Sequence, residues 1–593
     1  MIKYTINASK YLYLRYFMKN NKTMLRKLLF ILTISPLFFG CTSDINEDNV
    51  ITAKGGVRYG GEFRFMSSEK VKSLFPLATT DIYGARIVSQ IFEGLLKIDP
   101  ASTDLIPGIA KETHIDEDLK VYTFKLRDDV FFHDDACFPE GKGRKVTAHD
   151  FKYSLEFACS NDELNQLPFL LKDKISGADS YYKGEASEVE GIKVIDDYTL
   201  VIELKSPFSV FEKVLTHSSL GVFPKEAMDK YGKEIYAHPV GTGAFVLDEM
   251  VEDKIVLARN NKYWDKDDFG NPLPFLDKIT MTYSQNKTDE LLSFRAEKID
   301  LVMDIPVEEV QNVLGTLPEA QAGANIKHKV DSKASMSITY YGFATKEGLF
   351  ADKNIRKAFN MAIDRKKIID NWLEGEGWPI VHGFVPKMKN YPIEKVKGFS
   401  YDVEKAQDLL ANAGYPGGKD FPEIKLYINA LDGSGQHILG KAVATSLKNN
   451  LGIDVTIELV TFMEREELVS SGDAIFWKAG WVADYPDAEN FLSLFYGGNI
   501  SEKNASMNPF NYNNPVFNGL YEKALVETDE TKRNELFAKC DQLVIDDAVV
   551  MPLINDDFIT MVNMKVRKFV TNEMEQLDFS RIFIKELNTS INK

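Results

Sequence analysis

Apolar and polar residues alternate along several short segments of the chain, and this period of two is typical of strands with one buried face. The segments are 61–66, 121–127 and 198–204. Residues 84–96 instead place apolar side chains at helical spacing, which predicts a helix. Another helix is expected from Thr147, because Asp150 stands at the position from which a side chain reaches back in a capping box.

A corner between a strand and a helix is predicted late in the chain. The strand is expected at 474–477, and Pro486 favours a helix start because proline is preferred at the first helical position. Between them, Gly480 and Val482 offer backbone N–H and C=O groups beside the carboxylate of Asp484. Such a corner could hold an extended molecule that carries a positive charge at one end.

A simpler interpretation of the same corner stays open. Asp484 stands two residues before the proline and could accept backbone N–H bonds as a helix cap. Trp481 would then be a core residue. The residues of this segment do not by themselves choose between ligand binding and capping.

The N-terminal region reads as an export signal. Residues 24–40 contain two basic residues and then about a dozen apolar ones, too few for a membrane span, which needs about twenty. Cys41 follows a glycine, as in a bacterial lipobox, although Phe38 and Phe39 depart from the usual pattern. We therefore expect lipidation of Cys41, with the start codon at either Met1 or Met24.

The rest of the chain is strongly acidic. Without residues 1–40, 64 basic residues stand against 88 acidic ones, a net charge of about −24. This charge argues against binding to nucleic acid, which needs clustered Lys and Arg. It also argues against docking on an anionic membrane, so the lipid on Cys41 would be the only membrane anchor. Residues 41–57 are expected to be a flexible tether, and the remaining length is enough for two or three domains.

The other three cysteines have no motif around them. Cys137 and Cys159 could form a disulfide in an exported chain or could remain a pair of free thiols. Cys540 lies on a predicted helix and is expected to be a free core residue.

No motif for catalysis, metal binding or a cofactor is found. The chain lacks HExxH, CxxC and GxSxG. Residues 435–441 approach a phosphate loop, but Ala442 replaces the Ser or Thr that would bind Mg²⁺, so an amphipathic helix is the better interpretation. Residues 265–270 hint at a calcium loop, which Phe269 rules out at a ligand position. We expect no enzyme activity, no metal and no cofactor.

The order of motifs along the chain resembles a known family, the oligopeptide, dipeptide and nickel class of solute-binding proteins that serve ABC importers. The motifs are spread over nearly the whole chain after residue 58. They lie at 92–95, 109–134, 146–155, 239–245, 258–264, 276–279, 355–368, 401–410 and 478–491. Each is weak alone, and their order makes the resemblance specific. The glycines at 241 and 243 are expected to serve tight turns.

The resemblance implies an α/β fold with two lobes of the periplasmic-binding-protein type and an additional subdomain. The implied boundaries divide the chain into three parts. Lobe I would contain 58–95, 219–334 and 549–593, the extra subdomain 96–218, and lobe II 335–548. A ligand would lie between the lobes and would be buried when they close.

The resemblance also implies roles for particular residues. Asp484 matches an acidic residue that pairs with a peptide's α-amino group, and Gly480 and Val482 match positions whose backbone bonds to the peptide. Lys478 stands where some members carry a basic residue facing the carboxylate end, and Trp481 could line a side-chain pocket. Opposing contacts would come from the loop on the first lobe. Its residues are Thr80, Asp81 and Ile82, of which Asp81 could instead cap the following helix.

The expected function is therefore capture of short peptides for an ABC importer permease by a monomeric, lipid-anchored protein of the cell envelope. Two alternatives stay open. The same fold could bind nickel, haem, oligosaccharides or signalling peptides, or the chain could be a surface lipoprotein hydrolase.

Overall fold

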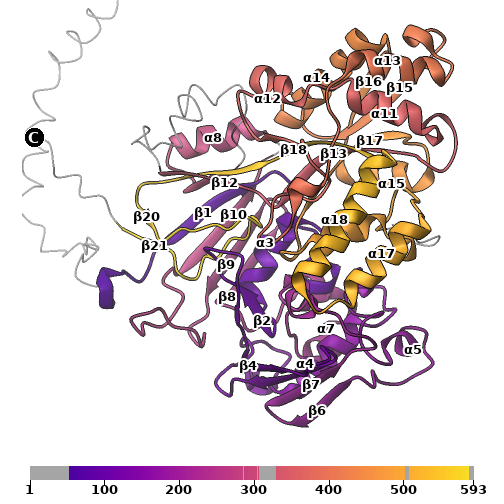
Figure 1. Ribbon diagram of the computed structural model, residues 1–593. Helices are drawn as coiled ribbons and strands as arrows, with labels where there is room; N and C mark the ends of the chain where they lie inside the picture. The colour runs from indigo at the N-terminus through magenta and orange to yellow at the C-terminus, as the bar shows by residue number, and fades with distance from the viewer. Residues whose placement is uncertain (1–51, 285, 304, 306–328, 501–506, 586–593) are drawn as a thin grey trace, which may run out of the picture. The chain divides into compact units, whose positions relative to one another are not determined.

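The computed structural model describes residues 52–284, 286–303, 305, 329–500 and 507–585. Cys41 and the predicted signal at 24–40 lie outside these residues. Within the described part, no helix has both the length and the apolar character to cross a membrane. Two large β-sheets organise this part of the chain (Figure 1).

The first sheet has seven strands in the order β12-β19-β11-β1-β10-β9-β8. Their bounds are β1 Glu62–Ser67, β8 Phe245–Val251, β9 Lys254–Arg259, β10 Lys278–Tyr283, β11 Leu301–Met303, β12 Lys329–Ala334 and β19 Asp557–Val562. In β1, Phe63, Phe65 and Ser67 are buried at alternate positions, as the sequence period predicts. Helices α3 (Ile82–Ile91) and α8 (Lys287–Arg295) belong to the same predicted lobe as this sheet.

The second sheet has six strands in the order β14-β18-β13-β17-β15-β16. Their bounds are β13 Ser337–Phe343, β14 Trp378–Pro379, β15 Ile424–Asn429, β16 Val455–Val460, β17 Phe476–Val482 and β18 Val550–Asn555. Every residue of β13 is buried, because hydrophobic clusters lie on both faces of this sheet.

Helices surround the second sheet (Figure 1). Their bounds are α11 Lys353–Met361, α12 Arg365–Trp372, α13 Val403–Asn412, α14 Gly435–Leu451, α15 Phe462–Ser471, α16 Ala488–Leu492, α17 Pro515–Leu525 and α18 Glu530–Asp546. Residues 435–441 thus begin the long helix α14, as predicted in preference to a phosphate loop. Cys540 is a free, buried cysteine on α18, also as predicted.

The chain passes between the two sheets at two adjacent points. One passage lies between β12 and β13 and the other between β18 and β19, and the backbone N–H of Ser335 donates to the carbonyl of Asp556 at 3.0 Å. The predicted boundary at 549 lies ahead of β18, whereas the chain leaves the second sheet only after that strand. The alternation of apolar and polar residues predicts a strand but not the sheet that it joins. The predicted boundary therefore lies one strand too early.

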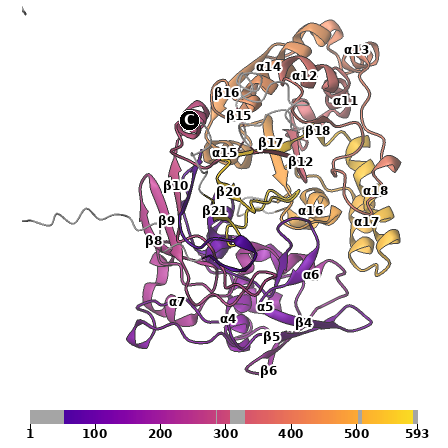
Figure 2. The ribbon, with the colours of Figure 1, turned by 90° about the vertical axis from the view of Figure 1, so that its left-hand side faces the viewer.

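A four-stranded sheet, β4-β5-β7-β6, forms a separate layer with short helices beside it (Figure 2). The bounds in this region are β2 Leu96–Ile98, β3 Leu105–Pro107, β4 Ala110–Ile115, β5 Val121–Leu126, β6 Ile192–Asp196, β7 Thr199–Glu203, α4 Ala148–Ala158, α5 Ala178–Tyr182, α6 Phe211–Val214 and α7 Lys225–Tyr231. The capping box predicted at Thr147 and Asp150 is present at the start of α4. Near the C-terminal end of the described chain, β20 (Val566–Arg567) pairs with β21 (Phe583–Ile584).

One sequence expectation is wrong in this part of the chain, and one alternative that the sequence left open is decided. Residues 52–57 of the predicted tether are attached to the fold, because Val57 is buried and the backbone of Lys54 exchanges hydrogen bonds with the Asn271 side chain at 3.1 and 3.0 Å. The disulfide is not formed, since Cys137 and Cys159 are both free.

The two glycines expected in tight turns have another role. Neither Gly241 nor Gly243 has a positive φ. A Cβ on Gly241 would lie 2.1 Å from the carbonyl oxygen of Ile91, and one on Gly243 would lie 2.4 Å from that of Gln90. These glycines therefore allow the chain to pass directly over the end of α3.

We predict that Gly241→Ala destabilises the protein by about 1–3 kcal/mol, because a methyl group there must displace a buried backbone. Gly519 is the matched control, since it lies inside α17 with nothing within 4 Å of an added Cβ. Gly519→Ala should stabilise by about 0.5–1 kcal/mol, the usual helix preference for alanine. Urea unfolding measures both. Equal effects of the two substitutions would contradict the close-packing role.

Candidate functional site

Strand β17 leaves one backbone edge open beside the predicted site. It pairs with β13 along its whole length, whereas β15 meets it only at Tyr427 and Trp477. The N–H of Ala483 donates to Met336 of the β13 side at 2.9 Å. Because successive residues of an antiparallel pair alternate in direction, the N–H and C=O groups of Gly480 and Val482 point away from β13. Among the described residues no strand occupies that edge.

The same alternation sorts the side chains of β17. Lys478 and Val482 lie on one face of the sheet, and Trp481 lies on the other. Trp481 is half-buried against the hydrophobic cluster beneath α16 and α18, and its indole N–H donates to Asn490 Oδ1 at 2.9 Å. These contacts correspond to the core interpretation of Trp481.

Asp484 does not cap a helix. Helix α16 begins at Ala488, two residues later than Pro486 suggested, and its cap is Asp487, which accepts from the N–H of Glu489 at 3.1 Å. The side chain of Asp484 is instead held by Asn490, whose Nδ2 donates to Oδ2 at 3.1 Å. Because the Asp484 side chain is 30% exposed and a carboxylate has about four acceptor positions, this side chain can accept further hydrogen bonds.

The predicted loop of the first lobe lies near Asp484. Nε2 of His217 is 3.6 Å from Oδ1 of Asp484. Its other ring nitrogen, Nδ1, accepts from the N–H of Ser219 at 3.1 Å, so the proton of a neutral ring is on Nε2 and faces the carboxylate. The hydroxyl of Ser219 donates to the carbonyl of Thr79 at 3.4 Å. Neither His217 nor Asn490 was identified as a site residue from the sequence. Asn490 could have been found, because it lies within the motif at 478–491, whereas His217 lies in none of the motifs.

The three loop residues differ in their surroundings. Thr80 is exposed, and Ile82 is the first residue of α3. Asp81 accepts from the N–H of Gly84 at 2.8 Å and so caps α3, which was the alternative considered for it. This capping leaves Asp81 with less acceptor capacity for a ligand.

Lys478 lies in an electrostatically unusual position. Its pKa is lowered to about 8, mainly by burial and also by the like charge of Arg465, while the charge of Asp556 acts in the opposite direction. Arg465 also donates to the carbonyl of Lys478 at 3.1 Å. Nearby, the buried Oε1 of Gln436 has no hydrogen-bond partner in the described part of the chain. An anionic group placed here would favour the charged form of Lys478.

An ion pair joins the extra subdomain to the second lobe close to Asp484. The ammonium of Lys213, on α6, bonds to Asp487 Oδ2 at 2.9 Å and to the carbonyl of Pro486 at 3.0 Å. Arg533, on α18, bonds to the same Asp487 oxygen at 2.9 Å and to the hydroxyl of Ser209 at 2.9 Å. This network fixes the segment that leads from Asp484 to α16.

The described residues contain no group of three or more His, Cys, Asp or Glu that could hold a metal ion. The seven histidines among the described residues are therefore not gathered into a metal site there, and His328 lies outside these residues.

Proteins of known sequence share this organisation over most of its length. The chain is 29% identical over 537 residues to the oligopeptide-binding protein OppA of Bacillus subtilis, covering 89% of this chain and 92% of that protein. It is 28% identical over 498 residues to the periplasmic oligopeptide-binding protein OppA of Salmonella typhimurium, covering 82% and 86%.

Solved structures show the same fold. A periplasmic oligopeptide-binding protein from Borrelia burgdorferi matches with a TM-score of 0.77 at 27% identity, covering 88% of this chain and 99% of that one. The periplasmic binding protein DppA from Helicobacter pylori, in complex with the peptide STSA, matches with a TM-score of 0.75 at 24% identity, covering 89% and 99%. The predicted two-lobed α/β fold is thereby confirmed.

The family model of the bacterial extracellular solute-binding proteins, family 5, matches residues 104–503. This match covers more than half of the chain and confirms the resemblance found in the sequence. The prediction that the chain is not an enzyme is confirmed as well, because the family consists of solute-binding proteins. The chain belongs to the bacterial extracellular solute-binding proteins, family 5.

Proposed function

We propose that this protein is the substrate-binding lipoprotein of an ABC importer, which captures short peptides between its two lobes and delivers them to a permease. The observation that carries the proposal is the open edge of β17, with a partly exposed carboxylate at its end. Backbone groups on such an edge pair with the main chain of an added strand, whatever its side chains are.

The arrangement of charges favours one direction for the peptide. Its α-amino group would pair with Asp484, and its main chain would bond to Gly480 and Val482. Its carboxylate would face Lys478. Six residue steps separate Lys478 from Asp484, and at about 3.3 Å per step they span roughly 20 Å. Peptides of two to five residues fit within this length. Thr80, Asp81 and Ile82 would contribute from the opposing lobe.

The open edge also favours a peptide over the other ligands found among relatives. Haem-binding protein A of Haemophilus influenzae is 26% identical to this chain, and so is a probable deoxycholate-binding periplasmic protein of Escherichia coli. Haem and bile acids lack the alternating amide groups that would satisfy the N–H and C=O groups of a strand edge. A peptide supplies both.

Placement in the cell envelope follows from the sequence. Lipidation of Cys41 would tether the protein, as a monomer, to the periplasmic face or the cell surface. Mass spectrometry of the protein purified from its membrane would reveal the lipid on Cys41.

Native mass spectrometry of the protein without its signal, followed by release and identification of the bound molecules, tests the ligand class. A mixture of peptides of two to five residues is the expected result. A single haem, sugar or metal chelate would replace the peptide in the proposal.

We predict that Asp484→Asn weakens the binding of these peptides at least tenfold, about 1.4 kcal/mol, because the amine loses its carboxylate partner. Asparagine keeps an oxygen for Asn490, so the fold is retained. Asp473→Asn is the control, since Asp473 is exposed in the turn before β17. Isothermal titration calorimetry measures the affinities, and an unchanged affinity of Asp484→Asn would argue against the amine pairing.

The lowered pKa of Lys478 predicts a pH dependence. With a pKa of about 8, Lys478 is mostly charged at pH 7 and mostly neutral at pH 9, so its attraction for the peptide carboxylate is lost as the pH rises. The matched variant is Lys478→Arg, which stays charged throughout this range. The peptide amine also titrates near pH 8, but equally for both proteins.

The informative quantity is therefore the ratio of the two affinities. Relative to Lys478→Arg, the natural protein should lose up to about tenfold in affinity between pH 7 and 9, because only about one tenth of the lysine is still protonated at one pH unit above its pKa. A constant ratio would show that Lys478 does not contact the carboxylate.

A further inference from the structure

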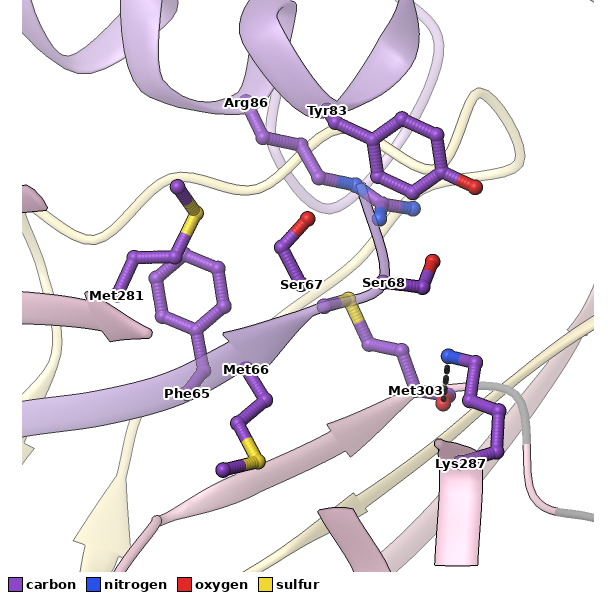
Figure 3. A pocket seen from close by; sticks show the side chains of 9 residues that line it. All are labelled: Phe65, Met66, Ser67, Ser68, Tyr83, Arg86, Met281, Lys287 and Met303. Atoms are coloured by element: carbon purple, nitrogen blue, oxygen red, sulfur yellow. Dashed lines mark hydrogen bonds between the residues drawn. The ribbon is translucent and has the colours of Figure 1, made fainter. Parts of the chain in front are cut away.

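A small cavity lies in the first lobe where β1 ends beneath α3 (Figure 3). Its polar lining comes from Ser67 and Ser68 after β1, Tyr83 and Arg86 on α3, and Lys287 at the start of α8. Phenylalanine and methionine side chains of the sheet complete the wall. The cavity has room for about one water molecule and opens toward solvent.

Arg86 is the unusual group in this wall. It is only 8% exposed, and its Nε is buried without a hydrogen-bond partner among the residues that the structure describes. Within the described part of the chain, its guanidinium makes one hydrogen bond, to Glu575 Oε2 at 3.4 Å, and lies 5.7 Å from the centre of the Phe558 ring. A guanidinium carries five N–H donors, so most of this donor capacity is unused. Figure 3 shows Arg86 pointing from α3 toward Ser67 and Ser68.

The charges near Arg86 are nearly balanced. Lys287 bonds to Glu290 at 3.2 Å and to the carbonyl of Met303 at 3.3 Å, and Arg86 faces Glu575. The hydroxyl of Ser67 donates to the carbonyl of Glu69 and accepts from its N–H. The cavity therefore offers unused N–H donors on a buried cation, and not a large excess of positive charge. A planar group with two acceptor oxygens matches such donors best.

Short stretches of chain and hydrogen bonds connect this cavity with both sides of the proposed peptide site. Arg86 is four residues after Ile82 on α3, one helical turn beyond the loop that would oppose the peptide. On the other side, Glu575 accepts from the hydroxyl of Ser335 at 2.8 Å. Ser335 is two residues from Ser337, which is paired with Val482 on β17.

We propose that this cavity is a subsite for a carboxylate of the bound peptide, with Arg86 as its principal hydrogen-bond donor. The proposal rests on the proposed function and adds a preference to it. The carboxylate would be that of an acidic side chain, because the C-terminus is assigned to Lys478, and one of its oxygens would take the place of the water molecule that the cavity can hold. Lys287 would support the same anion from the opposite wall.

Calorimetry with matched peptides tests the subsite. One series carries Glu or Gln at the second, third or fourth position of a tetrapeptide, and another compares a free with an amidated C-terminus. The natural protein should bind the Glu member of one Glu/Gln pair at least tenfold more tightly. Arg86→Gln should reduce that preference to less than about threefold while leaving the affinity for the neutral member unchanged.

Two controls separate the role of Arg86 from general effects. Arg86→Lys keeps the charge without the planar fork and should retain only part of the preference, whereas Lys111→Gln, an exposed position in the extra subdomain, should retain all of it. Thermal unfolding and the affinity for the neutral peptide report whether Arg86→Gln is folded.

The outcomes distinguish the two proposals. A preference in the Glu series that depends on Arg86 supports the subsite, whereas a preference in the amide series that depends on Arg86 would assign the cavity to the C-terminus in place of Lys478. If peptides bind with dependence on Asp484 but without preference in either series, or if Arg86→Gln weakens all peptides equally, the cavity holds water only and the subsite is overturned. If no peptide binds at all, both proposals fail.

Discussion

The antiparallel pairing of β17 with β13 is the constraint on which the site depends. Each strand residue presents its N–H and C=O in one direction only, and the pairing directs those of Trp481 and Ala483 toward β13. Gly480 and Val482 must then face the opposite edge. Since β15 diverges after Trp477, the sheet itself creates a row of unpaired groups at the point where the chain turns toward Asp484.

A second constraint holds the extra subdomain close to this edge. Asp487 is a buried carboxylate with three roles, because it caps α16, pairs with Lys213 of the extra subdomain and pairs with Arg533 of α18. A buried charge of this kind is tolerated only when it is fully partnered, so the two cations and the acid require one another. The same contacts bring His217 to Asp484, because α6, which carries Lys213, immediately precedes His217.

The sequence could predict what depends on local pattern or on the order of motifs. The capping box at Thr147, the long helix after residue 435 and the two-lobed fold are of this kind. It could not predict that β17 continues through Val482, because whether a strand continues depends on its partner. It also favoured Pro486 as a helix start, although a fully partnered Asp487 one residue later determines where the helix begins. His217 was missed because its contact with Asp484 forms only when the second lobe packs near it, and the sequence around His217 does not show this.

In the proposed site, the backbone and the side chains of this protein would recognise different parts of a peptide. A strand added to the open edge would have its main chain read by Gly480 and Val482, and its side chains would alternate between the two faces of the sheet. One face carries Lys478, and the other carries the apolar contacts around Trp481. Main-chain hydrogen bonds do not depend on the sequence of the ligand. Ion pairs at its two charged ends would fix only its direction and its length. Preference among peptides of equal length would therefore arise from side-chain contacts, and the buried, incompletely bonded guanidinium of Arg86 offers such a contact on the facing lobe.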